Sequence, residues 1–230
     1  MTTVVLLGQA ATTVTSTSVT LSNVNWIPGD VLYLMYAVGA EGASFSDSNN
    51  GTWVSGYNSN LVGNINKIYF PGSGSIFGRA ISVRSDFGSN ETVRISVTNG
   101  TAIGFQLWRV RSSSPSVSPG SLPEVSTTGA SYSVSVTFPN VKNNSIVLAS
   151  SFYRYDQVVS DGDTIRGTWS SPVRTLIGAT DWVFSISTQL KTVTAAGNQT
   201  YSVFFDISTS SGALIVEIPV PSLPHWGVAT

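Results

Sequence analysis

Apolar and polar residues alternate with a period of two in many segments of the chain. Residues 93–97, 133–138 and 201–205 are clear examples. Successive side chains of a β-strand point to opposite faces, so this alternation predicts half-buried strands, and no helical stripe competes with it. The dipeptides between these segments supply the fixed or positive φ that tight reversals need: Pro28-Gly29, Asn50-Gly51, Pro71-Gly72 and Asn99-Gly100. The pattern predicts an all-β fold of antiparallel β-sandwich or jelly-roll type.

Two halves of the chain resemble each other in collinear order. The sharpest match is Gly-Thr-Trp, which occurs at 51–53 and again at 167–169. Four further pairs of segments match in the same order: 18–24 with 135–141, 30–34 with 145–149, 45–47 with 159–161, and 90–93 with 198–201, which also places Gly104 on Gly212. Internal similarity of this kind predicts a tandem duplication in which each half buries its own interior around its own Trp.

Proline, glycine and serine mark the boundary between the halves. Residues 112–123 have the composition of a linker. The predicted organisation is a first β-sandwich at 1–111, a second at 124–219 and a proline-rich, extended arm at 220–230. An insertion around residues 61–78 predicts a long loop in the first half, which is a candidate contact surface.

Aromatic residues on this loop and on the arm are candidate partner contacts. They are Tyr69 and Phe70 in the loop, and His225 and Trp226 on the arm. A Trp on an extended arm is expected to dock on a neighbouring subunit or on its own domain, because a large ring left in water is unfavourable.

Charge and composition exclude several classes of function. The chain has 11 Lys+Arg against 12 Asp+Glu, a formal net charge of −1, and no Cys. No long-range field attracts nucleic acid or anionic lipid, and disulfides and thiolate zinc sites are excluded. No stretch approaches the roughly 20 apolar residues of a membrane helix, and the first eight residues lack the features of a signal peptide. These features predict a soluble protein made in a cytoplasm.

Candidate catalytic and metal-binding groups are few. The single His, His225, lies on the proline-rich arm, and we interpret it as a packing or solvent residue rather than a catalytic base. Asp161 and Asp163, with Asp156 nearby, have oxygen ligands for calcium, but this spacing is more typical of a turn. Asp47 and Asp161 leave an acid-pair glycosidase as a third hypothesis. The leading prediction has no catalytic residue, no metal and no cofactor.

Trp53 and Trp169 have two possible roles. An exposed Trp on a β-sandwich is a platform for sugar rings, and Tyr57 and Tyr69 could extend it. Their matched positions instead favour packing in each half. Three other tryptophans are also predicted to pack: Trp26, Trp108 and Trp182.

Five arginines cluster in the later strands of the first half and predict a mildly positive face. They are Arg79, Arg84, Arg94, Arg109 and Arg111.

A pattern of four segments runs through the first half: residues 18–24, Pro-Gly-Asp-Val-Leu-Tyr-Leu at 28–34, Gly-Thr-Trp at 51–53 and the closing strand that ends at 108–110. This pattern resembles virion structural proteins of tailed bacteriophages, and the resemblance covers each half of the chain nearly end to end. The second half departs from it, with Asn144-Ser145 in place of Gly29-Asp30. The resemblance implies β-sandwich domains of capsid-decorating, tail-associated or fibre-associated proteins. It implies a scaffold and carries over no catalytic or binding residue.

The predicted function is that of a non-enzymatic virion component. We expect a capsid decoration or cement protein that is a homo-oligomer, contacts the capsid shell or tail proteins, and resides on the virion after assembly in the bacterial cytoplasm. The alternative is a carbohydrate- or receptor-binding module of a tail or fibre, with Trp53, Tyr57 and Trp169 as stacking residues.

Overall fold

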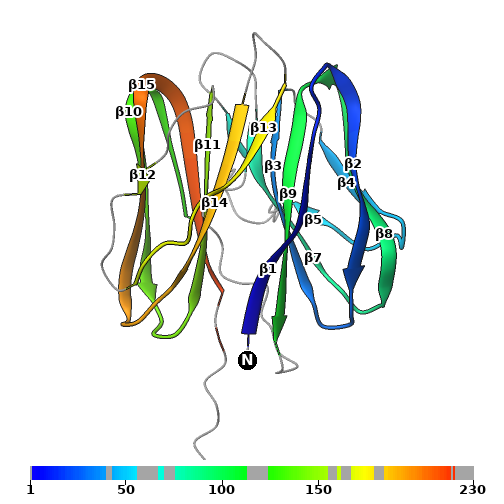
Figure 1. Cartoon of the computed structure of the whole chain (residues 1–230), viewed down its shortest axis with the longest axis horizontal. Coiled ribbons are helices and arrows are strands. Elements are labelled where there is room, and N and C mark those ends of the chain that lie inside the picture. Colours follow the sequence, from blue (N-terminus) through cyan, green and yellow to red (C-terminus); the bar gives the residue numbers. More distant parts are fainter. Residues whose placement is uncertain are drawn as a thin grey trace, which may run out of the picture.

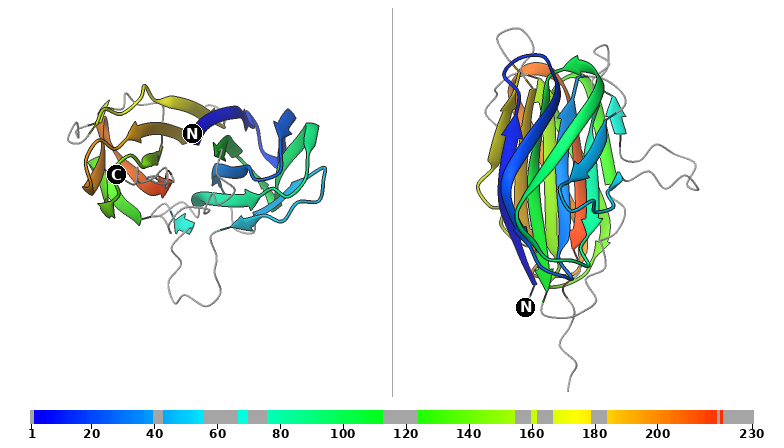
Figure 2. Two further views of the ribbon diagram at one scale, coloured as in Figure 1. Left: turned by 90° about the horizontal axis from the view of Figure 1, so that it is seen from below. Right: turned by 90° about the vertical axis from the view of Figure 1, so that its right-hand side faces the viewer.

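A computed structural model of the chain describes residues 2–39, 43–55, 67–69, 76–112, 124–154, 160–161, 167–178, 184–218 and 220. Throughout this part every regular element is a β-strand, which confirms the predicted all-β class. Figure 1 shows the strands arranged in layers side by side, and Figure 2 shows them running along the length of the body.

The first half forms two facing sheets. The first inner sheet has the order β1-β9-β3-β7-β5, with β6 also paired to β7, and the first outer sheet has the order β2-β8-β4. The bounds in the inner sheet are β1 (Thr2–Ala11), β3 (Val31–Val38), β5 (Val54–Ser55), β6 (Lys67–Tyr69), β7 (Ile76–Val83) and β9 (Ile103–Ser112). Those in the outer sheet are β2 (Ser16–Trp26), β4 (Ser44–Asp47) and β8 (Gly88–Thr101).

The second half forms a single sheet that bends over itself. Its order is β10-β15-β11-β14-β13, with β12 paired to β15. The bounds are β10 (Glu124–Val141), β11 (Ile146–Arg154), β12 (Ser160–Asp161), β13 (Val173–Ile177), β14 (Phe184–Thr192) and β15 (Gly197–Ile218). Because β10 and β15 are long, one part of each lies in an outer layer with β12, and the other part of each belongs to the layer of β11, where β15 pairs with β11 (Figure 1).

Three apolar clusters hold these layers together. One lies between the two sheets of the first half and includes Leu34 and Ile95. A second lies inside the bent sheet of the second half and includes Val147 and Val203. The third, which we call the joint core, lies between the first inner sheet and the second-half sheet. Each half therefore buries an interior of its own, and a further core unites the two halves.

Strand β3 is buried on both faces, and its sequence explains why. Leu32 and Leu34 point into the first-half cluster, whereas Tyr33 and Met35 point into the joint core. The run from Val31 to Val38 is apolar at every position, as expected of a strand covered on both sides. An alternating strand would have left one face suited to water.

The halves pair their strands in corresponding order, but two of the matched segments are displaced. Ser18 lies opposite Ser96, and Ser133 lies opposite Phe204. Because the match at 90–93 places Ser96 on Phe204, the counterpart of Ser18 is Ser133 and not Ser135. Likewise Asp161 lies opposite Val203, the counterpart of Ile95, so it corresponds to Phe45 and not to Asp47. A shift by two keeps every side chain on its face, so the apolar pattern could not reveal it.

The predicted loop and linker are only partly described. The loop prediction for 61–78 is wrong in two places, because Lys67–Tyr69 and the start of β7 are strands that pair with each other. Strand β9 ends at Ser112 and β10 begins at Glu124. The rest of the predicted linker, 113–123, lies outside the described residues, as does the arm at 221–230.

Candidate functional site

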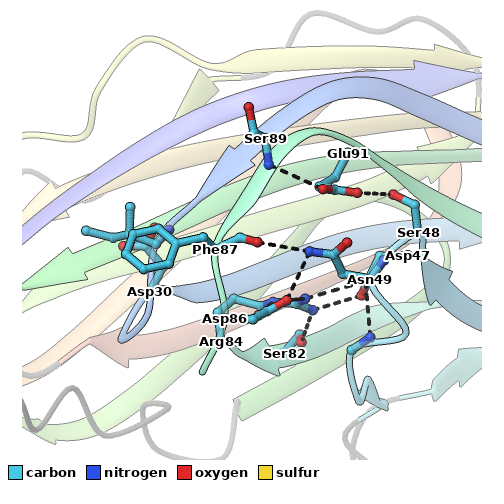
Figure 3. A network of polar contacts seen from close by, with 12 residues as sticks. Asp30, Asp47, Ser48, Asn49, Ser82, Arg84, Asp86, Phe87, Ser89 and Glu91 are labelled. Atoms are coloured by element: carbon cyan, nitrogen blue, oxygen red, sulfur yellow. Dashed lines mark hydrogen bonds and ion pairs between the residues drawn. The ribbon is translucent and has the colours of Figure 1, made fainter.

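A network of polar side chains closes one end of the first half (Figure 3). We call Asp47, Asn49, Trp53, Arg84 and Asp86 the end network. The Asp47 carboxylate accepts hydrogen bonds from Trp53 Nε1 at 2.7 Å and Arg84 Nη1 at 2.8 Å on Oδ2. Its Oδ1 accepts from the backbone N–H groups of Asn49 and Gly51. The chain between β4 and β5 thereby wraps around one carboxylate.

Arg84 is the cation at the centre of this network. Its guanidinium donates to both oxygens of Asp86, at 3.0 and 2.9 Å, and stacks over the Trp26 ring at 4.2 Å. The hydrogen bond from Arg84 lowers the pKa of the Asp86 carboxyl, and Asn49 adds to this effect. The Asp47–Arg84 pair is buried, so neither partner can be lost without leaving a charge in an apolar setting.

The end network is a structural clamp rather than a reactive centre. Both oxygens of Asp47 are occupied by donors of the chain itself. Gly51 is required by this packing, since a Cβ at this position would overlap the Arg84 guanidinium. The arrangement fixes the position of Trp53 and of the strand that follows it.

The structure does not bring Asp47 and Asp161 together. They lie in β4 and β12, which belong to the opposite outer layers of the body (Figure 1). The acid-pair hypothesis built on these two residues is therefore wrong in its geometry. Asp156 and Asp163 lie outside the described residues, among which no group of three or more His, Cys, Asp or Glu could hold a metal ion.

Polar groups cross the joint core and join the two halves. Gln106 on β9 donates from Nε2 to Val173 O at 2.9 Å and to Thr175 Oγ1 at 3.0 Å. The Thr175 hydroxyl donates in turn to Gln9 Oε1 at 2.6 Å. Each donor or acceptor is thus satisfied by the other half of the chain, and separating the halves would leave Gln106 without these partners.

Two glycines at corresponding positions act as sockets for the opposite half. A Cβ on Gly104 would overlap Ile177, and a Cβ on Gly212 would overlap Phe77. Phe77 also stacks on Phe152 with 4.1 Å between the ring centroids. Side chains of each half therefore pack directly against a glycine of the other half. This close packing favours a single rigid body over two independently moving domains.

The five arginines do not form one positive face. Arg79 and Arg84 are buried, Arg94 is exposed on the first outer sheet, and Arg111 forms an ion pair with Asp30. The face prediction is therefore wrong, because Arg79 and Arg84 point into the interior and only Arg94 belongs to the first outer sheet. Burial at the joint core lowers the pKa of Arg79 to about 10.

Large apolar side chains gather at an exposed corner of the second half. We call Tyr132, Phe204 and Ile207 the corner patch; Tyr132 is 62% exposed and the other two are nearly half exposed. Ser131 lies opposite Thr209 and Ser133 opposite Phe204, so Tyr132 alone faces residues 205–208 of β15. This bulge coincides with the bend in β10 and β15, and it turns side chains outward.

A second group of exposed apolar side chains lies beside the end network. We call Ile27 and Phe87 the end patch, and they are 39% and 74% exposed. Trp26 lies opposite Gly88, so the adjacent Ile27 and Phe87 are neighbours. Figure 3 shows the Phe87 ring turned away from the Asp47–Arg84 pair, on the side of Asp30.

The candidate stacking residues are not presented to solvent together. Trp169 is only 6% exposed and contacts Tyr201, while Trp53 is half-buried and bound to Asp47. Trp26 and Trp108 are buried, as their packing role requires. The remaining candidates, or their side chains, lie outside the described residues: Tyr57, Tyr69, Phe70, Trp182, His225 and Trp226.

Sequence reasoning missed both patches, although one signal was present. Val203, Phe204 and Phe205 are consecutive apolar residues in a strand, so one of them must point away from the core. Phe204 is that residue. Phe87 follows a strand and has no such signal in its neighbours.

No family model, curated protein or solved structure matches the chain. In the described part, no helix is long and apolar enough to cross a membrane.

Proposed function

We propose that the chain is a non-enzymatic structural protein of a tailed-phage virion, and that it acts as a decoration or cement protein through subunit–subunit contacts. The observation that carries this proposal is the corner patch on an interlocked two-lobed body. Exposed aromatic and aliphatic groups are enriched at the centres of protein interfaces. A rigid body presents such a patch without an entropic cost of ordering it on contact.

The surroundings of the corner patch also support a contact role. The outer face of the second half carries hydroxyl pairs across β10 and β15, Ser135 with Ser202 at 2.8 Å and Thr137 with Thr200 at 2.9 Å. These hydroxyls bond to each other and give a neutral face around the apolar groups. A neutral polar rim around an apolar centre is the usual anatomy of a protein interface.

Two measurements test the proposal. We expect sedimentation to show a homo-oligomer that dissociates when Tyr132 and Phe204 are both replaced by Ser, whereas Thr20→Ala on the first outer sheet leaves it intact. Cryo-electron microscopy of particles whose genome encodes the chain should show the two-lobed body on the surface. Particles without this density would contradict the virion role, and an unchanged oligomer would contradict the contact surface.

We infer that the two halves arose by duplication of one β-sandwich unit. The support is a shared strand order and a turn bonded alike before β3 and β11. Gly29 N donates to Arg84 O, and Arg84 N to Asp30 O; Asn144 N donates to Val193 O, and Val193 N to Ser145 O. Experimental coordinates in which the halves had unlike strand order would contradict a common origin.

A carbohydrate- or receptor-binding role is the second candidate, and the exposure of Tyr132 favours it. An aromatic ring open to solvent beside a strand of hydroxyls is suited to stack against a sugar. If this candidate is correct, Tyr132→Ala abolishes glycan binding measured by calorimetry while Thr20→Ala retains it. Absence of binding by the unaltered chain to a broad glycan panel would eliminate the role.

A further inference from the structure

The outer layer of the second half has one long strand at its edge. Within the described residues, the part of β10 from Ser131 to Val141 pairs with β15 on one side and with no strand on the other. Figure 1 shows this layer at the left margin of the body. The N–H and C=O groups along such an edge are a template for another strand, unless short length, charge or proline blocks it.

Residues 133–138 of β10 lack these protective features. They are six consecutive residues that pair with β15 in one unbroken register, and none of them is charged or a proline. The opposite edge of the same layer is β12, which has only two residues. The edge at 133–138 is therefore the one that is suited to pair with a further strand.

Pro139 indicates which backbone groups point to the open side. A proline in a strand that is paired on one side turns its nitrogen to the other side, because it cannot donate to the ladder. Residues two apart direct their N–H and C=O groups alike, so Ser135 and Thr137 also point to the open side. Ser133 belongs to the same set, and its N–H donates to the Ser131 hydroxyl at 3.2 Å.

The segment is complementary to a second copy of itself. Directly opposite residues of an antiparallel pair share a face of the sheet. If Ser135 lies opposite its own copy on a two-fold axis, Ser133 lies opposite Thr137, and Val134 lies opposite Val136. Hydroxyls then meet hydroxyls on the outer face, and buried valines meet buried valines on the inner face. Both the polar face and the apolar interior continue from one copy to the next.

The same register gives a partner to the most exposed member of the corner patch. Tyr132 lies opposite Phe138 of the second copy, so two aromatic rings meet across the new strand pair. Tyr132 is 62% exposed in the single chain, whereas Phe138 belongs to the second-half cluster. Pairing of the two edges therefore covers part of the corner patch.

The corresponding edge of the first half carries a charge. Thr20 of β2 is the counterpart of Ser135, but it lies opposite Arg94, whereas Ser135 lies opposite Ser202. Arg94 is exposed, and its guanidinium donates to the Ser18 hydroxyl of β2 at 2.9 Å. A two-fold axis at β2 brings two of these cations toward each other, which disfavours self-pairing of that edge.

We propose that two copies of the chain join through the β10 edge, antiparallel about a two-fold axis at Ser135, into one sheet that spans both second halves. The second copy adds its strand through backbone hydrogen bonds, and the packing of Tyr132 against Phe138 sets the register. This contact rests on the self-association that the proposed function includes, and it does not depend on the virion role.

Opposite charges at one position test the two-fold axis. Ser135→Lys and Ser135→Glu should each raise the dissociation constant of the dimer at least about tenfold, because like charges face each other across the axis. An equimolar mixture of the two variants should dimerise again, because the charges then attract. Sedimentation over a range of protein concentrations measures all three samples. Thr20→Lys and Thr20→Glu are the matched controls and should leave the dimer unchanged.

The outcomes separate the edge pairing from the wider contact role. If both charged variants at Ser135 dimerise as tightly as the unaltered chain, the edge pairing is overturned while self-association through another surface stands. If the unaltered chain is monomeric at every concentration, self-association and the edge pairing are both overturned.

Cross-linking gives a second readout, because the chain has no Cys of its own. Neighbouring strands are about 4.8 Å apart, so the two copies of Ser135 are adjacent, whereas the two copies of Ser202 lie about 14 Å apart. Ser135→Cys should therefore form a linked dimer with a short bifunctional maleimide about tenfold faster than Ser202→Cys, the matched control on β15. Denaturing electrophoresis measures both rates. Equal rates for the two variants would overturn the proposal.

Discussion

The turns that enter β3 and β11 have the same backbone hydrogen bonds and different side-chain chemistry. In the first half the turn carries the acid: Asp30 binds Arg111 of β9 through two bonds of 2.7 Å. In the second half the strand carries it: Glu217 accepts from the Ser145 hydroxyl at 2.7 Å and from Lys142 N at 2.8 Å. The same backbone turn thus accommodates an ion pair in one half and a hydroxyl–carboxylate hydrogen bond in the other half.

The contrast extends into the interiors beneath these turns. Arg84 of the end network corresponds to Val193, which is buried in the second-half cluster. Even the shared Gly-Thr-Trp segment needs its glycine for different reasons. Gly51 makes room for Arg84, whereas Gly167 has a φ of 132° and lies against Thr192 O. Matched positions of the two halves therefore share a backbone conformation, while the side-chain interactions that stabilise it differ.

The largest effect is expected at the position where a cation in one half corresponds to valine in the other. Arg84→Met should destabilise the fold by about 3–4 kcal/mol, because it leaves the Asp47 carboxylate buried without its cation. Urea unfolding measures this loss. Adding Asp47→Asn should recover part of it, and Arg94→Met on the exposed face is the matched control. Equal small losses for the two arginine variants would contradict a buried clamp.

A substitution at Gly212 tests how closely the two halves pack against each other. Gly212→Ala should cost about 3 kcal/mol, since the new methyl group overlaps the Phe77 ring at the joint core. Combining it with Phe77→Leu should restore stability relative to the sum of the two changes. Gly100→Ala at the exposed end of β8 serves as the control. An alanine at 212 that is tolerated as well as one at 100 would mean that the interlock is loose.

Exchanging Asp30 and Ser145, which occupy matching positions of the two turns, tests whether each turn requires its own side-chain chemistry. Asp30→Ser should cost about 2 kcal/mol, because Arg111 loses two charged hydrogen bonds but remains partly hydrated. Ser145→Asp should be destabilising as well, since it brings a second carboxylate against Glu217. Thermal unfolding of both variants measures the pair. If Ser145→Asp stabilised the chain, the contrast in charge between the turns would have no energetic basis.

The smallest effect is expected at alkaline pH. In the joint core the first half has a titratable tyrosine at a position where the second half has a leucine. Burial raises the pKa of Tyr33 to about 12, whereas its counterpart in the second half is Leu148. Between pH 10 and 12 the folded chain keeps this proton and the unfolded chain loses it, so Tyr33 lowers stability as pH rises. The lowered pKa of Arg79 acts in the opposite direction above about pH 10.

Tyr33→Phe separates these two contributions. The variant should lose less stability than the parent chain between pH 8 and 11, by about 1 kcal/mol. Urea midpoints at the two pH values measure the difference, and Tyr132→Phe on the exposed corner is the control. Parallel losses in all three proteins would show that Tyr33 does not titrate as a buried group.

Much of the fold was predictable from local patterns, but the candidate surfaces were not. The alternation at 133–138 and the turn at Pro28-Gly29 depend on neighbouring residues alone, and both predictions are confirmed as strand and turn. The predicted match of 18–24 with 135–141 was displaced by two residues from the pairing in the structure. A shift of two residues leaves the same side chains facing the core, so the sequence pattern fits both alignments equally well. Tyr132 has the same parity as the buried Val134 and Val136, so the alternation predicts it to be buried, and only the bulge in the β10–β15 pairing turns it outward. Phe87 follows no periodic signal.

The sequence by itself determined the all-β class, most of the strand segments and several of the turns between them. These properties follow from local sterics and from the period of the pleat. The tertiary structure decided that Tyr33 and Phe77 meet the second half instead of water, and that Gly104 and Gly212 become sockets. Contacts between residues far apart in the chain depend on how whole sheets pack, and no local pattern encodes that choice.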